Sequence, residues 1–419
     1  MPDFRFRLPP IGELTNAQQI AYHDPGALMI TGGPGSGKTV VSIYRFRRTM
    51  LNDQNGMFFT FNRTLMASVK GTFRQAAEII FPDLADNQRA DLINHKVASI
   101  FEWYGGRFHA ALSEDQAEAI ENNFRNYINA NRNGNRYREI VIDESQDLHP
   151  NIISNSHLLA NLVSCGADRS QDLQGHYAPN PADDVIFDLL PDNTTRQELT
   201  RNFRNTKEVF EFARQFVPED LDVQNIDTDD LPEGEVPDLR GGLSVDLQNN
   251  LIKEIIEQNP ALNIGILVHF KSQILTLKSF LEQNGYSCAA NAADATSFSY
   301  YYNGMPQVDK YVMENRLRTP FILTFDSCKG LEFDIVIIPY FEKANWALST
   351  QRQERNDEGN WINVFNADGT PKMWATPNHY YVGATRARRQ LYILYNENPS
   401  ILDVHNDEHQ DLFQYDLPF

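Results

Sequence analysis

Cysteine is scarce in this chain of 419 residues, where only Cys165, Cys288 and Cys328 occur, far apart from one another. No two of them form the C-x-x-C pairs that zinc sites and disulfide frameworks use, so a reducing compartment is favoured. The chain also lacks any uninterrupted apolar run near the roughly 18 residues that a membrane span needs, and no apolar leader follows Met1. We therefore expect a cytoplasmic protein without a membrane partner.

Positive charge is in short supply as well. Lys and Arg together number 37 against 56 Asp and Glu, which gives a formal net charge of −19. Such acidity argues against a loose, global attraction to nucleic acid, although it does not exclude a locally basic groove. Residues 219–238 hold nine acidic side chains and no Lys or Arg. We interpret this segment as a solvated linker, the alternative being a docking segment for a basic partner.

The order of apolar and amphipathic segments predicts the fold class. Apolar, β-branched runs are followed by amphipathic stretches along most of the chain, which is typical of an α/β fold with parallel sheets. The length suits two domains, which we place at residues 1–200 and 201–419. The polar residues 70–135 predict a helical insertion in the first domain, and residues 342–378, with three tryptophans, an irregular insertion in the second. The predicted strands are 27–31, 57–60, 139–142, 162–165, 263–268, 321–324, 335–339 and 391–395.

The most informative segment is 32–39, which reads Gly-Gly-Pro-Gly-Ser-Gly-Lys-Thr and matches the phosphate-loop pattern G-x-x-x-x-G-K-[ST]. The glycines let backbone N–H groups converge on phosphates, Lys38 supplies a point charge, and the Thr39 hydroxyl is a Mg²⁺ ligand. The preceding strand and the following helix, whose N-terminal dipole would face the phosphates, give the pattern its expected context. The sequence thus predicts an ATP or GTP site made by Gly32, Gly33, Pro34, Gly35, Ser36, Gly37, Lys38 and Thr39.

A second motif lies about a hundred residues further on. Residues 139–147 read Glu-Ile-Val-Ile-Asp-Glu-Ser-Gln-Asp, so an apolar strand delivers two carboxylates to its C-terminal end, where open α/β sheets bind ligands. We expect Asp143 to hold Mg²⁺ and Glu144 to act as the general base on the attacking water. The two motifs together predict a nucleotide-hydrolysing enzyme rather than a passive binder.

The chain resembles superfamily 1 helicases of the UvrD/Rep type. Residues 143–147 resemble the family's D-E-x-Q-D box, and other motifs follow in the family's order. Residues 14–21 resemble the motif whose glutamine, here Gln18, reads the adenine edge. Residues 165–173 are similar to the G-D-x-x-Q motif, in which Gln171 would sense the γ-phosphate. Residues 58–68 resemble the strand-contacting segment, which implies nucleic-acid contacts for Phe61, Asn62 and Arg63.

The resemblance continues through the second half of the chain. Residues 199–204 resemble the N-Y-R motif, so that Phe203 would stack on the base and Arg204 would reach the γ-phosphate. Residues 324–333 resemble T-x-H-x-x-K-G-L-E-F, which implies that Thr324 contacts the strand and Glu332 the nucleotide. Residues 382–387 resemble V-A-x-T-R-A and imply that Arg386 is a second arginine finger.

The resemblance implies two tandem RecA-like phosphate-loop NTPase lobes with parallel sheets and small helical insertions, with ATP and Mg²⁺ as cofactors. It implies ATP hydrolysis between the lobes that drives a translocase or helicase along a single strand, with DNA favoured and a 3′ to 5′ polarity. The chain is short for this family, so we expect a compact form with reduced accessory domains.

Several positions depart from the family pattern and keep a second hypothesis open. Val40 and Ala167 replace the family's arginine and glycine, Gln174 replaces a tyrosine, and Asp326 stands where the family has the histidine of T-x-H. A carboxylate beside a phosphodiester repels it. The alternative function is therefore an ATP-driven conformational switch that acts mainly on a protein partner.

Overall fold

The computed structural model describes every residue except 1–7, 54, 76, 131–135, 218–227, 229, 357–358, 404–413 and 416–419. The chain forms two units. The described residues of 8–201 and 366–368 form the N-terminal unit, and those of 202–365 and 369–419 form the C-terminal unit. Half of the acidic segment 219–238, residues 219–227 and 229, lies outside the described residues.

A six-stranded, all-parallel sheet forms the centre of the N-terminal unit, in the order β3-β2-β4-β5-β1-β6. Strands β1 and β2 are buried along their whole length, as expected for a parallel sheet covered on both faces. The strands are β1 (Leu28–Gly32), β2 (Gly56–Thr60), β3 (Val97–Ser99), β4 (Tyr137–Asp143), β5 (Ala160–Ala167) and β6 (Thr195–Leu199).

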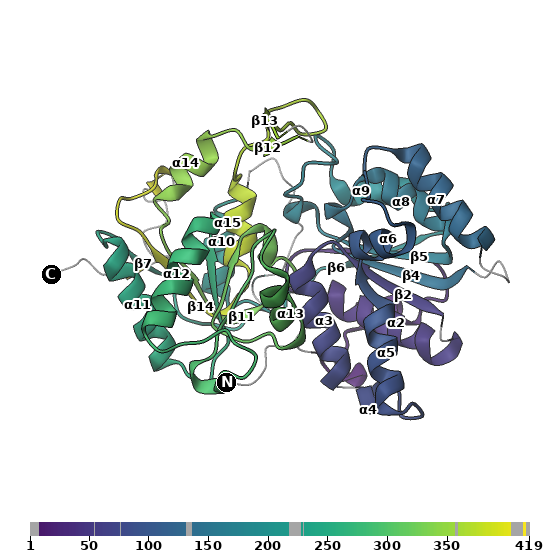
Figure 1. Cartoon of the computed structure of the whole chain (residues 1–419), viewed down its shortest axis with the longest axis horizontal. Coiled ribbons are helices and arrows are strands. Elements are labelled where there is room, and N and C mark those ends of the chain that lie inside the picture. The colour runs from purple at the N-terminus through teal and green to yellow at the C-terminus, as the bar shows by residue number, and fades with distance from the viewer. Residues whose placement is uncertain are drawn as a thin grey trace. The chain divides into compact units, whose positions relative to one another are not determined.

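Helices cover both faces of this sheet (Figure 1). The side chains of β2 alternate between the two layers. Phe58 packs against Phe46 of the helix that follows the phosphate loop, with ring centroids 5.9 Å apart, whereas Phe59 meets Trp103 on the other face at 5.3 Å. The helices are α1 (Asn16–His23), α2 (Lys38–Asp53), α3 (Arg63–Gln75), α4 (Ala77–Ile80), α5 (Asp86–Lys96), α6 (Ile100–Phe108), α7 (Ala117–Ala130), α8 (Pro150–Asn155) and α9 (Ala182–Leu189).

The C-terminal unit is built on a second parallel sheet, of seven strands in the order β15-β7-β14-β11-β8-β10-β9. A separate antiparallel pair, β12 (Gln353–Arg355) and β13 (Trp361–Asn363), lies in the insertion 342–378. The sheet strands are β7 (Asp238–Arg240), β8 (Ile264–Val268), β9 (Ser299–Tyr300), β10 (Phe321–Thr324), β11 (Phe333–Ile338), β14 (Ala387–Leu394) and β15 (Gln414–Tyr415). The helices are α10 (Lys207–Arg214), α11 (Val245–Gln258), α12 (Lys271–Gln283), α13 (Gln307–Asn315), α14 (Lys343–Ser349), α15 (Pro377–Ala384) and α16 (Ser400–Asp403).

The predicted class, an α/β fold with two parallel sheets in tandem, is confirmed. The inserted residues 70–135 are mostly helical, but they also contain β3, which adds an edge strand beside β2. The insertion 342–378 holds α14 and the β12–β13 pair rather than only irregular chain. No helix among the described residues is both long enough and apolar enough to span a membrane.

Candidate nucleotide site

The phosphate loop joins the end of β1 to the first turn of α2, and its backbone requires glycine. Gly37 has a φ of 89°, and a Cβ placed there would lie 2.3 Å from Nε2 of Gln18. A Cβ at Gly32 would lie 2.3 Å from the carbonyl oxygen of Leu199. Any side chain at either position would therefore displace the neighbouring strand or helix, so glycine alone lets the loop adopt this path.

Lys38 is held above the loop by three acceptors. Its ammonium donates to the carbonyl oxygens of Gly32 at 2.7 Å and Gly33 at 2.9 Å, and to Oδ2 of Asp168 at 3.2 Å. Both ends of this ion pair are buried. The positive charge is thus fixed at the mouth of a loop whose N–H groups can bind an anion.

Asp143 ends β4 beside the first turn of α2. Its Oδ1 accepts a hydrogen bond from the hydroxyl of Ser42 at 3.3 Å, whereas its buried Oδ2 has no hydrogen-bond partner among the described residues. Burial and the neighbouring Glu144 raise the pKa of Asp143 to about 7, against the opposing effects of Thr39, Lys38 and Ser42. The unpaired carboxylate oxygen of Asp143 and the neighbouring Thr39 hydroxyl together offer only oxygen donors. Mg²⁺ prefers such donors, so these residues fit the metal.

A chain of hydrogen bonds connects Glu144 to Lys38 across the ends of β4 and β5. Gln146 donates from Nε2 to Oε2 of Glu144 at 2.6 Å, and its Oε1 accepts from the backbone N–H of Asp168 at 3.3 Å. Oδ2 of Asp168 accepts from Gln171 at 2.6 Å as well as from Lys38. The predicted base, the predicted γ-phosphate sensor and the loop lysine therefore belong to one polar network.

The backbone at Glu144 is strained. Its φ of 54° lies in the left-handed region, which costs a residue with a Cβ about 1–2 kcal/mol. The strand thus turns sharply after Asp143 into the 3₁₀ turn Ser145–Asp147. Strain of this kind persists where the surroundings fix it, here through the hydrogen bond from Gln146 and the bond from the Ser145 hydroxyl to the carbonyl of Gly166 at 3.0 Å.

Gln18 fastens helix α1 to the phosphate loop. Its Oε1 accepts from the backbone N–H of Thr15 at 3.0 Å as part of a capping box, and its Nε2 donates to the carbonyl of Ser36 at 3.0 Å. Both ends of the amide are thus engaged within the protein. The adenine contact that the resemblance implies for Gln18 stays a prediction.

The three predicted strand-contacting residues of the N-terminal unit follow β2, which lies next to β4 with Thr60 in register with Asp143. Each also has a structural contact. The ring of Phe61 packs on Phe101, Oδ1 of Asn62 caps α3 by accepting from the N–H of Thr64, and Arg63 forms an ion pair with Glu102. These residues lie at the same edge of the sheet as the nucleotide motif.

In the C-terminal unit the structure brings Arg204, Glu332 and Arg386 together. Nε of Arg204 donates to Oε2 of Glu332 at 3.3 Å, and Nη1 donates to the carbonyl of Thr385 at 3.4 Å. Arg386 donates from Nε to the carbonyl of Val382 at 2.9 Å. Phe203, next to Arg204, is half-exposed.

Thr324 is separated from that group within the same unit. It ends β10, so it lies at the carboxyl edge of the sheet, whereas Glu332 and Arg386 each precede a strand and lie at the amino edge. Its hydroxyl is 3.0 Å from that of Ser327. The predicted nucleotide-binding and strand-binding residues of this unit therefore occupy opposite edges.

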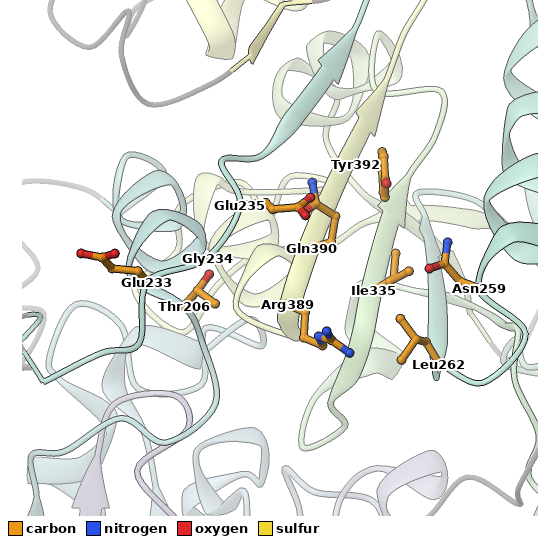
Figure 2. Close-up of a pocket in the computed structure, with 10 residues that line it drawn as sticks. All are labelled: Thr206, Glu233, Gly234, Glu235, Asn259, Leu262, Ile335, Arg389, Gln390 and Tyr392. Carbon is orange, nitrogen blue, oxygen red and sulfur yellow. The ribbon is translucent and has the colours of Figure 1, made fainter.

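A cavity of about 440 Å³ also lies toward the amino edge of the C-terminal sheet. Figure 2 shows Arg389 and Gln390 of β14 and Ile335 of β11 among the side chains that line it. None of the residues predicted to bind nucleotide or nucleic acid lines this cavity.

Ser42 and Gln146 contact predicted site residues but are not among the residues predicted from the sequence. Ser42 lies one helical turn after Lys38 on the same face of α2, so this spacing indicates that its hydroxyl lies near the site. Gln146 is part of the D-E-x-Q-D box, but its function of orienting Glu144 becomes visible only in the hydrogen bonds.

No protein-family model matches the chain, and no curated protein matches it in sequence. Among solved structures, the chain is similar to S. cerevisiae Dbp5 bound to RNA and ADP BeF3, with 12% identity, coverage of 97% of this chain and 90% of that one, and a TM-score of 0.49. It is also similar to an arterivirus nonstructural protein 10 (helicase) in complex with DNA. The identity is 12%, the match covers 92% of this chain and 64% of that chain, and the TM-score is 0.38.

A third similar structure is the C-terminal domain of a possible DNA helicase from Lactobacillus plantarum, with 14% identity, coverage of 51% of this chain and 98% of that one, and a TM-score of 0.30. Similarities at this level do not identify an activity. The site residues themselves carry the functional conclusion.

Proposed function

We propose that this protein is a Mg²⁺-ATP-dependent nucleic-acid translocase or helicase that moves 3′ to 5′ along single-stranded DNA. The observation that carries the proposal is the network of Lys38, Asp168, Gln146 and Glu144 at the edge where Asp143 presents an unpaired oxygen. These are the groups that phosphoryl transfer to water requires: a fixed cation, a metal ligand and an oriented base.

The phosphate loop and Lys38 would bind the triphosphate, with Thr39 and Asp143 holding the metal. When bound, Mg²⁺ would neutralise charge on the transferred phosphoryl group. Gln146 orients Glu144 by bonding one carboxylate oxygen, so that the other oxygen can accept a proton from the attacking water.

Asp168 would link the nucleotide to the rest of the molecule. One of its oxygens accepts from both Lys38 and Gln171. If a bound phosphate drew the Lys38 ammonium away, Oδ2 of Asp168 would accept a hydrogen bond from Gln171 alone. The hydrogen bonds that stabilise the turn after β5 would then change. A hydrogen-bond rearrangement of this kind is one way to couple hydrolysis to a conformational step.

Arg204 and Arg386 would stabilise charge on the transferred phosphoryl group. The family resemblance supports this assignment, and an arginine in that position is worth about 10³–10⁵ in rate. Glu332, which accepts from Arg204, would hold that guanidinium in place.

The test is the ATPase rate of the purified protein with and without a single-stranded DNA oligonucleotide, at low and moderate salt. We expect a stimulation of about tenfold or more that falls as salt rises, because strand binding releases counterions. A single-stranded RNA of the same length tests the preference for DNA.

The second candidate function is an ATP-driven switch for a protein partner, which the net charge of −19 favours. ATPase activity that neither DNA nor RNA stimulates would support the switch and contradict the translocase.

A further inference from the structure

Three aromatic side chains from separate parts of the C-terminal unit meet in one cluster. The ring of Phe270 lies 5.2 Å from that of Trp346 and 6.1 Å from that of Trp374, centroid to centroid. The two indoles are 6.1 Å apart and inclined by 35°. Trp346 is 47% exposed, so part of its indole is open to solvent. We refer to Phe270, Trp346 and Trp374 as the tryptophan cluster.

The tryptophan cluster lies at the carboxyl edge of the sheet. Phe270 follows β8 by two residues, and Val268 at the end of that strand is in register with Thr324. Helix α14, which carries Trp346, follows β11, the other neighbour of β8. The cluster is therefore at the edge where open parallel sheets bind ligands, beside the residue predicted to contact a strand.

The backbone around the cluster is tied together by hydrogen bonds. The N–H of Trp374 donates to the carbonyl of Thr350 at 3.0 Å, and the N–H of Ala375 donates to that of Ala347 at 3.0 Å. These bonds fix the returning chain of the insertion against the end of α14. The two indoles therefore have a defined separation and present a preformed surface, which lowers the entropy cost of binding.

Cations accompany the aromatic surface. The guanidinium of Arg352 lies 5.9 Å from the ring centroid of Trp374, and the ammonium of Lys271, the residue after Phe270, lies 4.4 Å from the ring of Tyr302. Arg352 also pairs with Glu354 at 3.0 Å, and that carboxylate is half-exposed. Aromatic faces with adjacent cations are the combination that proteins use for the bases and phosphates of a single strand.

The carboxylate of Asp326 is compensated. It lies 3.7 Å from Nε2 of His379, which comes from α15. Although burial acts to raise the pKa of Asp326, the neighbouring His379, together with Arg352 and Lys329, holds this pKa below its ordinary value. The histidine that the family has at this position is thus replaced by an Asp–His pair, so the negative charge does not stand alone beside a strand.

From these observations we propose that the tryptophan cluster is a base-stacking subsite for single-stranded nucleic acid, with Arg352 beside it for the backbone phosphate. The inference rests on the proposed function, because it names a place where the strand is held. It also explains how so acidic a protein could bind a polyanion: stacking energy does not depend on net charge.

The chain offers a matched control. Trp361 of β13 is 62% exposed and has the guanidinium of Arg355 at 5.0 Å from its ring, so it shares the chemistry of the cluster. It belongs to the same insertion but has no ring contact with the three clustered residues among those described. A generic effect of removing an exposed tryptophan would appear in both variants.

The experiment compares wild type, Trp346→Ala, Trp346→Phe and Trp361→Ala for binding of fluorescein-labelled dT20 and rU20, by anisotropy, and for ATPase activity. We expect Trp346→Ala to bind about 5- to 150-fold more weakly, the equivalent of one lost stacking contact. Trp346→Phe should recover most of the affinity, Trp361→Ala should bind like wild type, and the ATPase rate without a strand should be unchanged in all variants. Thermal melting of each variant shows that it is folded.

Each other outcome is decisive. If wild type binds a strand and folded Trp346→Ala binds it equally well, the subsite is wrong and the proposed function stands. If Trp361→Ala loses as much affinity as Trp346→Ala, the cluster has no special function and the inference fails. If wild type hydrolyses ATP but binds neither oligonucleotide, the inference and the proposed function fall together. A preference for rU20 over dT20 would contradict DNA as the strand of the proposed function, whereas the subsite would stand.

Discussion

Burial of the Asp143 carboxylate makes both its charge and the stability of the fold depend on pH. Folding raises its pKa to about 7, whereas the unfolded chain loses the same proton near pH 4. The folded state therefore holds a proton that the unfolded state has released, so this residue lowers stability progressively as pH rises from about 4 to 7. Above that range the carboxylate is ionised, buried and available to a metal.

The first prediction concerns Asp143→Asn. In EDTA and without nucleotide we expect the variant to be more stable than wild type at pH 8, with a difference that shrinks at pH 5, because asparagine carries no charge to bury. Urea unfolding at both pH values measures this. Addition of Mg²⁺ and ATP should then stabilise wild type and not the variant. A stability difference that does not change with pH would contradict the raised pKa.

The second prediction separates the base from the residue that orients it. Glu144→Gln should bind nucleotide and lose hydrolysis, because an amide cannot accept the proton of water. Gln146→Ala removes the hydrogen bond to Glu144 but keeps the carboxylate, so we expect a smaller loss of turnover and a normal nucleotide affinity. Single-turnover hydrolysis and a fluorescent nucleotide titration test both. Normal turnover in Glu144→Gln would exclude it as the base.

At the scale of elements, a buried ion pair holds the nucleotide-binding parts of the N-terminal unit together. Arg45 of α2 donates from Nε and Nη2 to Oε1 of Glu139 at the start of β4, at 3.0 and 2.8 Å. The same guanidinium donates to the carbonyls of Ala21 and Asp24 at the end of α1. One side chain thus joins the helix after the phosphate loop, the strand that carries Asp143 and the helix that carries Gln18.

The third prediction follows from this network. Glu139→Leu leaves the Arg45 charge buried without its partner, which costs about 3–5 kcal/mol of unfolding free energy. The comparison variant is Glu139→Gln, which also removes the charge but keeps an amide oxygen that accepts hydrogen bonds from Arg45, so we expect it to cost less than Glu139→Leu. Chemical denaturation at neutral pH compares the two. Equal stability of Glu139→Leu and wild type would show that the pair does not hold these elements.

Most of the central elements could be predicted from sequence, and the reason lies in their residues. Met57–Phe59 and Ile140–Ile142 are apolar and buried on both faces of a parallel sheet, so the strands are visible as apolar runs. Strand β6, which reads Thr-Arg-Gln-Glu-Leu, could not be predicted, because it is an exposed edge strand. Its position depends on pairing with β1, a contact that local sequence does not encode.

The site divides in the same way. The phosphate loop and the Asp143–Glu144 pair have spacings fixed by chemistry, so the sequence reveals them. The tryptophan cluster could not be predicted from the sequence. Phe270 lies more than seventy residues from Trp346, and only the sheet order β11-β8-β10 brings the two residues together. Likewise, His379 compensates Asp326 only because α15 returns to the end of β10.

For the whole molecule, the net charge of −19 limits how a strand can be held. Each phosphate that a cation neutralises on a single strand contributes about −0.7 to the slope of log K against log salt. With few cations beside the tryptophan cluster, we expect no more than about four such contacts, and a slope no steeper than about −3. Binding of dT20 measured across a salt series tests this fourth prediction. A much steeper slope would show that a basic track elsewhere dominates binding.

The hydrogen bond from Gln18 to the carbonyl of Ser36 couples helix α1 to the phosphate loop. Helix α1 has only eight residues and is too short to be stable by itself, so it relies on such attachments. Whatever draws the Gln18 amide toward a base or shifts the loop would loosen or tighten this helix. Amide hydrogen exchange in residues 16–23 should therefore serve as a built-in reporter of nucleotide occupancy, one that needs no label and follows the cycle from outside the phosphate loop.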